Sequence, residues 1–216
     1  DEIEKKVNEL IASFDLLHPE RSVAGLVNLY KAIDALADGY WKGQKLKEVK
    51  ELIAQCSGLF IDATTTEQFA VQTDSIKINF SINNRLGVDA VLQKIRVNNF
   101  DSSFSQTLGK NKNLNFSKTL AVPAAWPITQ PYWLETDMEE GHFNVKNPLK
   151  IGQPDVDNAY AVTAAVKIFD QLFEFSKSVK FKFTDQVKGE VYQPVIIVPS
   201  VLINVNPETI IKVGKE

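Results

Sequence analysis

The sequence predicts an α+β protein in which a three-helix N-terminal segment packs on an antiparallel β-sandwich. Apolar residues recur at steps of three and four before Gly58 and at steps of two after it, which is typical of amphipathic helices followed by half-buried strands. Of the 13 phenylalanines, 12 lie after residue 57, as do 8 of the 9 prolines. The later segments are short, about ten residues apart and free of helical periods, which favours a sandwich.

Three amphipathic helices account for residues 1–57, which we expect to form a helical connector. Pro19 ends the first helix or opens the second, because proline suits a first turn and not a helix interior. The Asp38-Gly39 pair stops the second helix, the third begins after Gly43, and Gly58 closes the third. Connections of about five residues let such helices fold back on one another. The predicted helices cover residues 3–17, 23–33 and 46–56.

From Leu59 onward, apolar and polar residues alternate. The clearest case is Ser75 to Asn83, where three isoleucines and a phenylalanine fall on one side and polar residues fall on the other. We therefore expect a β-sandwich over residues 58–199. Residues 200–216 form either its last strand or the start of a further sandwich module. The other strand candidates are residues 59–63, 70–71, 90–97, 104–108, 114–120, 160–169, 173–183, 192–198 and 201–205.

The stretch from Pro123 to Pro154 is predicted to be a long irregular excursion or an edge insertion. It holds five prolines and two of the three tryptophans, and proline cannot donate to a central strand ladder. Its aromatic residues either anchor the excursion on a sheet or stack on a sugar, because flat apolar rings serve both purposes. The candidate ligand or loop-anchor residues are Trp126, Tyr132, Trp133 and His142.

Composition and motifs exclude several other classes of function. A net charge of −3 and a pI near 5.6 provide no basic surface for nucleic acid, and no apolar run approaches the ~18 residues that membrane insertion requires. His18 and His142 lie far apart without a metal-binding pattern, and Cys56 is the only cysteine. The sequence contains no nucleophile elbow and no phosphate-binding loop. We therefore predict no catalytic, cofactor-binding or metal-ligating residue.

Several stretches together resemble one protein family. These are Gln130-Pro131-Tyr132-Trp133-Leu134, the helix-into-strand junction over residues 52–63, the alternating strands over residues 74–95, and Gly152-Gln153-Pro154. They are similar to elements of the large multidomain bacterial deacetylases of the PIG-L (LmbE-like) family, over about residues 20–200 of this chain. The chain opens without a methionine, so we expect a piece of a longer, processed polypeptide.

The resemblance implies the non-catalytic middle or C-terminal segment of such a protein, with an immunoglobulin-like sandwich after the helical connector. Family members remove acetyl groups from N-acetylated amino sugars with a zinc-dependent domain that carries an H-P-D-D run and a later H-x-x-H. Neither motif occurs here, so the segment is expected not to be an enzyme and to need no cofactor.

The implied role is to position the catalytic domain or to mediate interaction, with adjacent domains of the parent protein as partners and an extracytoplasmic location, either periplasmic or at the cell surface. The alternative is a carbohydrate-binding β-sandwich module. In that case the aromatic residues of the excursion and His142 line a sugar groove.

Overall fold

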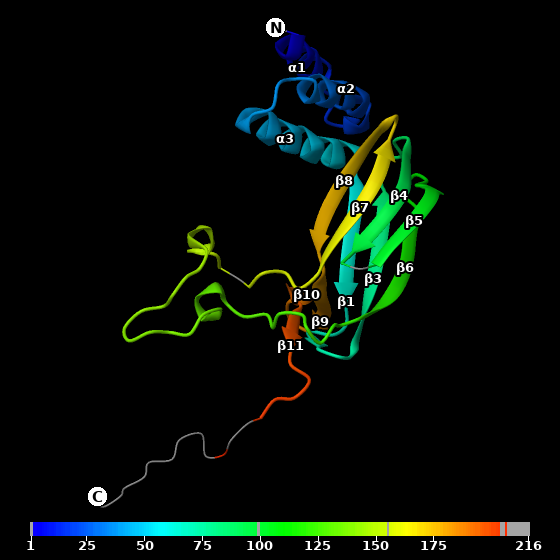
Figure 1. Ribbon diagram of the computed structural model, residues 1–216. Helices are drawn as coiled ribbons and strands as arrows, with labels where there is room; N and C mark the ends of the chain where they lie inside the picture. The colour runs from blue at the N-terminus through cyan, green and yellow to red at the C-terminus, as the bar shows by residue number, and fades with distance from the viewer. Residues whose placement is uncertain (1, 99, 155, 204–205, 207–216) are drawn as a thin grey trace, which may run out of the picture.

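The computed structural model describes residues 2–98, 100–154, 156–203 and 206, and it is an α+β protein (Figure 1). Three α-helices come first, and two β-sheets packed as a sandwich follow them. The helical elements are α1 (Glu2–Ser13), η1 (Pro19–Ser22), α2 (Val23–Asp34), α3 (Tyr40–Ser57), η2 (Tyr132–Leu134) and η3 (Pro148–Lys150). The strands are β1 (Leu59–Thr65), β2 (Phe69–Val71), β3 (Ser75–Asn84), β4 (Ala90–Val97), β5 (Phe100–Thr107), β6 (Asn113–Ala121), β7 (Ala161–Ile168), β8 (Gln171–Ser178), β9 (Lys180–Asp185), β10 (Gly189–Pro194) and β11 (Ile196–Val198).

Helix α1 ends at Ser13, so the predicted extension to Leu17 is wrong. The Ser13 hydroxyl donates to the carbonyl of Glu9 at 2.8 Å, and the Asp15 carboxylate accepts from the amide of Leu17 at 2.9 Å. Such local side-chain bonds offer the backbone an alternative to the helix.

Helix α3 begins at Tyr40, earlier than the predicted start after Gly43. The amide of Gly43 donates to the carbonyl of Gly39 at 3.2 Å, so the glycine lies within the first helical turns. The error arises because glycine weakens a helix by only about 1 kcal/mol, which neighbouring contacts offset. Trp41 therefore lies on the helix and not in the preceding turn.

Gly58 ends α3 as the sequence predicts. Its φ of +62° is left-handed, and its amide donates to the carbonyls of Ala54 and Gln55. A Cβ at this position would lie 3.0 Å from Leu86 and 3.1 Å from Arg85, so space as well as conformation favours glycine.

The sandwich consists of a five-stranded sheet in the order β10-β9-β1-β3-β6 and a four-stranded sheet in the order β5-β4-β7-β8, together with a two-stranded pair of β11 and β2. Strand β3 confirms the predicted alternation, because Ile76, Ile78, Phe80 and Ile82 are all buried. It pairs antiparallel with β1 and with β6, so it is an interior strand of the first sheet, next to the edge strand β6.

Two short ladders are parallel and depart from the fully antiparallel prediction. Residues 173–183 were expected to form one strand, but Val179 divides them into β8 and β9, which belong to different sheets. The amide of Val179 donates to the carbonyl of Tyr160 at 2.9 Å at the crossing point. Because β9 leaves the second sheet for the first, it meets β1 in parallel, and β11 likewise pairs in parallel with β2.

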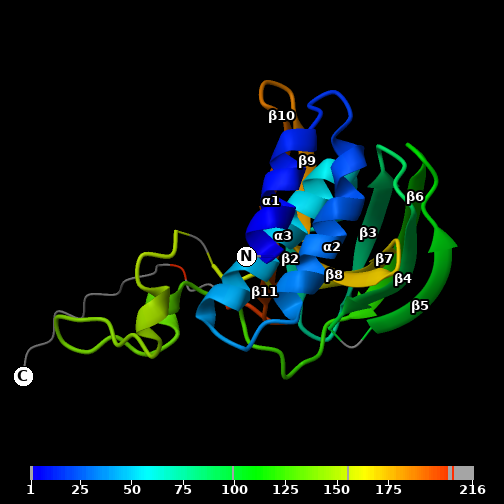
Figure 2. The ribbon, with the colours of Figure 1, turned by 90° about the horizontal axis from the view of Figure 1, so that it is seen from above.

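The helices and the sandwich share one hydrophobic core. The ring of Tyr30 in α2 packs edge-on against Phe173 in β8, with centroids 4.9 Å apart. An ion pair between Lys31 and Asp170 joins the same two regions. The helices lie at the end of the sandwich where β1 begins (Figure 1), and Figure 2 shows them next to one another when seen from that end. The predicted packing of helices on the sandwich is therefore confirmed.

Asn84 connects two loops at one end of the sandwich, the loop between β3 and β4 and the loop between β5 and β6. Its fully buried side chain donates to the carbonyls of Val88 and Leu108, at 2.8 Å each, and accepts from the amide of Gly87 at 3.1 Å. Its backbone carbonyl accepts from the amide of Asn111 at 2.8 Å. One buried side chain thus satisfies three backbone groups, and the Leu108 carbonyl among them belongs to a buried residue.

The predicted strand over residues 201–205 is not present in its described part. Residues Val201, Leu202 and Ile203 are exposed and outside any strand. Residues 204, 205 and 207–216 lie outside the described residues, so the two alternatives for the end of the chain stay predictions.

Candidate functional site

Residues 130–154, here called the arm, project away from the sandwich (Figure 1). The irregular excursion predicted from the prolines is confirmed, since only the short turns η2 and η3 interrupt it. Its root is attached to β11: the amide of Thr129 donates to the carbonyl of Ile197, and the amide of Ile197 donates to the Thr129 hydroxyl, both at 3.0 Å.

Trp126 lies at the root of the arm and packs on the sandwich. Its ring meets that of Tyr160 edge-on, with centroids 4.9 Å apart, and its carbonyl accepts from the Gln72 amide group at 2.6 Å. Tyr160 is buried among the core residues. Trp126 therefore has the geometry of a loop anchor.

Tyr132 and Trp133 lie within the arm itself. Their rings are perpendicular, with centroids 4.9 Å apart, and the Tyr132 hydroxyl accepts from the amide of Gly152 at 3.1 Å. Tyr132 therefore joins the two halves of the arm. Trp133 is 37% exposed, so it is not buried on a sheet as an anchoring role would require.

An ion-pair network centred on Lys150 also holds the arm together. Its ammonium lies 2.7 Å from the carboxylates of Glu135 and Asp157, and the Gln153 side chain donates to Asp157 at 3.0 Å. These hydrogen bonds raise the pKa of Lys150, Asp157 contributing most, and the bond from Lys150 lowers the pKa of Asp157. The network is exposed, so it orders the arm more than it stabilises the fold.

His142 lies at a turn of the arm, where its Nε2 is 3.5 Å from a carboxylate oxygen of Glu139. Both side chains are mostly exposed. Within residues 2–98, 100–154, 156–203 and 206, no group of three or more His, Cys, Asp or Glu side chains is placed to hold a metal ion. The structure does not unite the four sequence candidates in one site: Trp126 lies at the root, and the other three lie along the arm.

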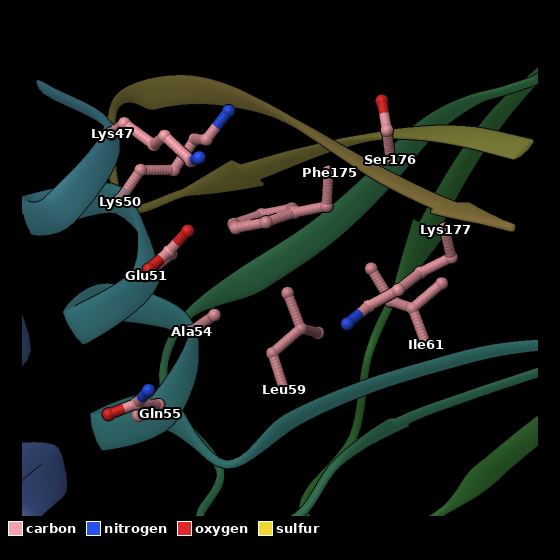
Figure 3. A pocket seen from close by; sticks show the side chains of 10 residues that line it. All are labelled: Lys47, Lys50, Glu51, Ala54, Gln55, Leu59, Ile61, Phe175, Ser176 and Lys177. Carbon is pink, nitrogen blue, oxygen red and sulfur yellow. The ribbon is translucent and has the colours of Figure 1, made fainter. Parts of the chain in front are cut away.

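A cleft of 570 Å³ lies between α3 and the sandwich (Figure 3). We call it the lysine cleft. Helix α3 forms one wall, and strands β1 and β8 form the other, with the Phe175 ring extending between them. Leu59, Ile61 and Ala54 complete an apolar floor. The lining residues are Lys47, Lys50, Glu51, Ala54, Gln55, Leu59, Ile61, Phe175, Ser176 and Lys177.

Three ammonium groups and one carboxylate border the lysine cleft. Lys47, Lys50 and Glu51 project from α3, and Lys177 projects toward them from β8. The Lys50 ammonium donates to the backbone carbonyl of Glu174 at 3.0 Å. Among the described residues, neither Lys47, Lys177 nor Glu51 forms an ion pair, so the cleft carries an excess positive charge.

The sequence reasoning missed this cleft. A local signal exists in Lys47, Lys50, Glu51 and Ala54, whose spacing of three and four residues places them on one face of α3. The contribution of Lys177 comes from a strand far along the chain, and no pattern in the sequence shows that it faces α3.

A second cavity, of 550 Å³, opens between α1, α2 and α3 and is almost wholly apolar. We call it the helical groove. A smaller apolar hollow continues it on the other side of Leu10 and Ile11, toward Phe14 and Cys56. Burial raises the pKa of the Cys56 thiol, which disfavours the reactive thiolate. Exposed apolar side chains border the two cavities: Val7, Ile11, Phe14, Leu36, Trp41 and Leu52.

No family model matches the sequence, and comparison with curated proteins finds no match. Two solved structures show a remote likeness. The CARDB domain of a Pyrococcus furiosus protein in complex with di-metal ions is 9% identical, with a TM-score of 0.28, over 56% of this chain and 88% of that domain. The alkylpurine DNA glycosylase AlkC of Pseudomonas fluorescens, bound to DNA containing an abasic site analogue, is 8% identical, with a TM-score of 0.26, over 80% of this chain and 50% of the glycosylase.

TM-scores at this level carry no argument about fold or function.

Among the described residues, no helix combines the length and the apolar character needed to span a membrane.

Proposed function

We propose that this chain is a non-catalytic accessory module of an exported PIG-L-like deacetylase, and that adjacent domains of the same protein cover its helical groove. The observation that carries the proposal is the exposed apolar surface of α1, α2 and α3. Six large apolar side chains around the helical groove are between 36% and 71% exposed, Val7 and Trp41 marking the two ends of that range.

The size of this surface supports a macromolecular partner. With ~200 Å² for each large side chain, the six residues expose on the order of 600 Å². That equals the largest apolar patches of ordinary monomers, ~300–600 Å², and approaches the ~800 Å² that each partner contributes to a standard interface. The deacetylase context, the extracytoplasmic location and the identity of the partner rest on the resemblance of Gln130–Leu134 and the flanking stretches to the family.

We further infer that the sandwich is immunoglobulin-like. Strands β1, β3, β6, β9 and β10 form one layer, and β5, β4, β7 and β8 form the other, so the chain crosses between layers after β3, β5, β6 and β8. This Greek-key order corresponds to a seven-strand immunoglobulin arrangement in which the fourth strand pairs with the third. Strand β9, which continues the chain after the seventh strand, β8, pairs in parallel with the first strand, β1.

Introducing a charge into the helical groove tests the proposal. Ile11 is 70% exposed, so we expect Ile11→Glu to change the stability of the isolated chain by less than ~0.5 kcal/mol. In the polypeptide that its gene encodes, the same change would bury a charge and cause a clear loss of thermal stability. Val187→Glu, at an exposed turn residue, is the matched control and should have no effect in either setting.

Three results would contradict the proposal. One is equal hydrogen exchange of α1 and α3 in the isolated chain and in the longer polypeptide, because a covering domain slows exchange. Another is release of acetate when the isolated chain is incubated with zinc and acetylated glucosamine oligomers. The third is a stable dimer in sedimentation, which would assign the groove to a second copy.

A carbohydrate-binding module is the second candidate. The observation that favours it is the partial exposure of Trp133 on a projecting arm, directly beside Tyr132. In that case a glycan array should show binding that Trp133→Ala removes without unfolding the protein. Under the first proposal no glycan binds.

A further inference from the structure

We propose that the lysine cleft binds a small amphiphilic anion, one that combines a carboxylate, sulfonate or phosphate head group with an apolar body. The inference is independent of the accessory role above, because it rests on the junction between α3 and the sandwich and not on the helical groove. A volume of 570 Å³ is within the ~300–1,000 Å³ typical of small-molecule sites.

The charges at the rim favour an anionic head group. Lys47 and Lys177 lie on opposite walls and form no ion pair among the described residues, so their hydrogen-bond donors remain available. Lys50 uses one donor on the carbonyl of Glu174 and retains two. An anion between the walls would receive charge-assisted hydrogen bonds from both sides.

The floor of the cleft favours an apolar body. The Phe175 ring and the side chains of Leu59, Ile61 and Ala54 line the cleft between the two lysines of α3 and Lys177 of β8. A fully hydrated inorganic ion would leave this floor uncovered, whereas an alkyl or aryl group would remove it from water at ~25 cal/mol per Å². The arrangement therefore selects molecules with both parts.

Glu51 gives the proposal a discriminating feature. It is an exposed carboxylate on the same wall as Lys47, so it repels an anion that the lysines attract. Removing its charge should strengthen binding, whereas removing a lysine charge should weaken it. A purely hydrophobic ligand would respond to neither change.

The experiment titrates the full chain with octanoate and octyl phosphate, and with 1-octanol as the neutral probe of equal chain length, by calorimetry and by backbone NMR. We expect both anions to shift the amide signals of α3 and β8, and 1-octanol to bind more weakly. Lys47→Gln and Lys177→Gln should each weaken anion binding roughly 3–10-fold, and Glu51→Gln should strengthen it roughly 2–5-fold, as expected for partly exposed charges.

Lys77→Gln is the matched control. Lys77 is exposed on β3, at the end opposite the Leu59–Asn84 pairing, and its replacement makes the same change in net charge. It should leave the affinity within a factor of two, apart from the general effect of salt. Because Lys47, Glu51 and Lys177 are exposed, the variants are expected to fold, which circular dichroism checks.

Three results would overturn the inference: equal affinity for octanoate and 1-octanol, lysine variants that bind as well as the unmodified chain, or shifts confined to residues around Ile11 and Leu52. The last result would place the probe in the helical groove. A preference for octyl phosphate over octanoate, or the reverse, would identify the head group that the cleft prefers.

Discussion

Replacing Asn84 by alanine removes the side chain that joins two loops at one end of the sandwich. The carbonyl of Leu108 would lose its partner in a buried environment, and the amide of Gly87 and the carbonyl of Val88 would lose theirs in a partly buried one. An unsatisfied buried group costs ~1–3 kcal/mol. The two partly buried groups can be reached by water and cost less, so the total should be near ~2–4 kcal/mol.

Urea unfolding, followed by fluorescence and by circular dichroism, measures this loss. With an m-value of ~2 kcal/mol per molar urea, the midpoint should fall by about 1–2 M. Asn115→Ala is the matched control, because Asn115 is exposed on β6, and its effect should stay within ~0.5 kcal/mol. A loss below ~1 kcal/mol in Asn84→Ala would refute the reasoning, since it would mean that the three groups find other partners.

Three further outcomes are expected. Trp126→Ala should lower the free energy of unfolding, measured with urea, by ~2–4 kcal/mol, because the Trp126 ring packs on the core. Trp133→Ala should lower it by less than ~1 kcal/mol. Equal losses would contradict the assignment of Trp126 as the loop anchor. Burial raises the pKa of Tyr160 to about 12, and its hydroxyl has no hydrogen-bond partner within the part of the chain that the structure describes. Since tyrosine titrates near 10 when unfolded, stability should fall as the pH rises from about 10 to 12, and Tyr160→Phe should remove this slope at no cost in stability at pH 7. The pKa of Asp157 is lowered in the folded protein, so its bond to Lys150 contributes stability above the unfolded pKa of about 3.9. This contribution is lost as the pH falls through the lower, folded pKa. Amide exchange of Gln153, measured between about pH 5 and pH 2, should report the loss.

The parts of the fold that follow from local periodicity could be predicted from the sequence. Strand β3 alternates apolar and polar residues from Ser75 to Asn83, and the stop at Gly58 needs only a left-handed residue after a helix. The division at Val179 could not be predicted, because Phe173, Phe175, Phe181 and Phe183 keep the same alternation on both sides of it. What changes there is the neighbouring strand, and that depends on the tertiary structure.

The candidate sites show the same limit. The prolines predict the irregular excursion, and the aromatic residues within it are visible in the sequence. The lysine cleft depends on Lys177 meeting α3, more than a hundred residues away along the chain. Lysines that alternate with apolar residues on a strand usually mark a solvent face, so the pattern around Lys177 predicts an ordinary surface.

The parallel ladders have a mechanical consequence. Strand β1 follows directly from the helices, and β11 is the last described strand, and each pairs in parallel, with β9 and β2 respectively. A load applied between the helical end and the chain beyond Val198 would pull these partners along their length in opposite directions. The hydrogen bonds of each ladder would then bear the force together rather than opening one after another. The fold would therefore resist extension along this line.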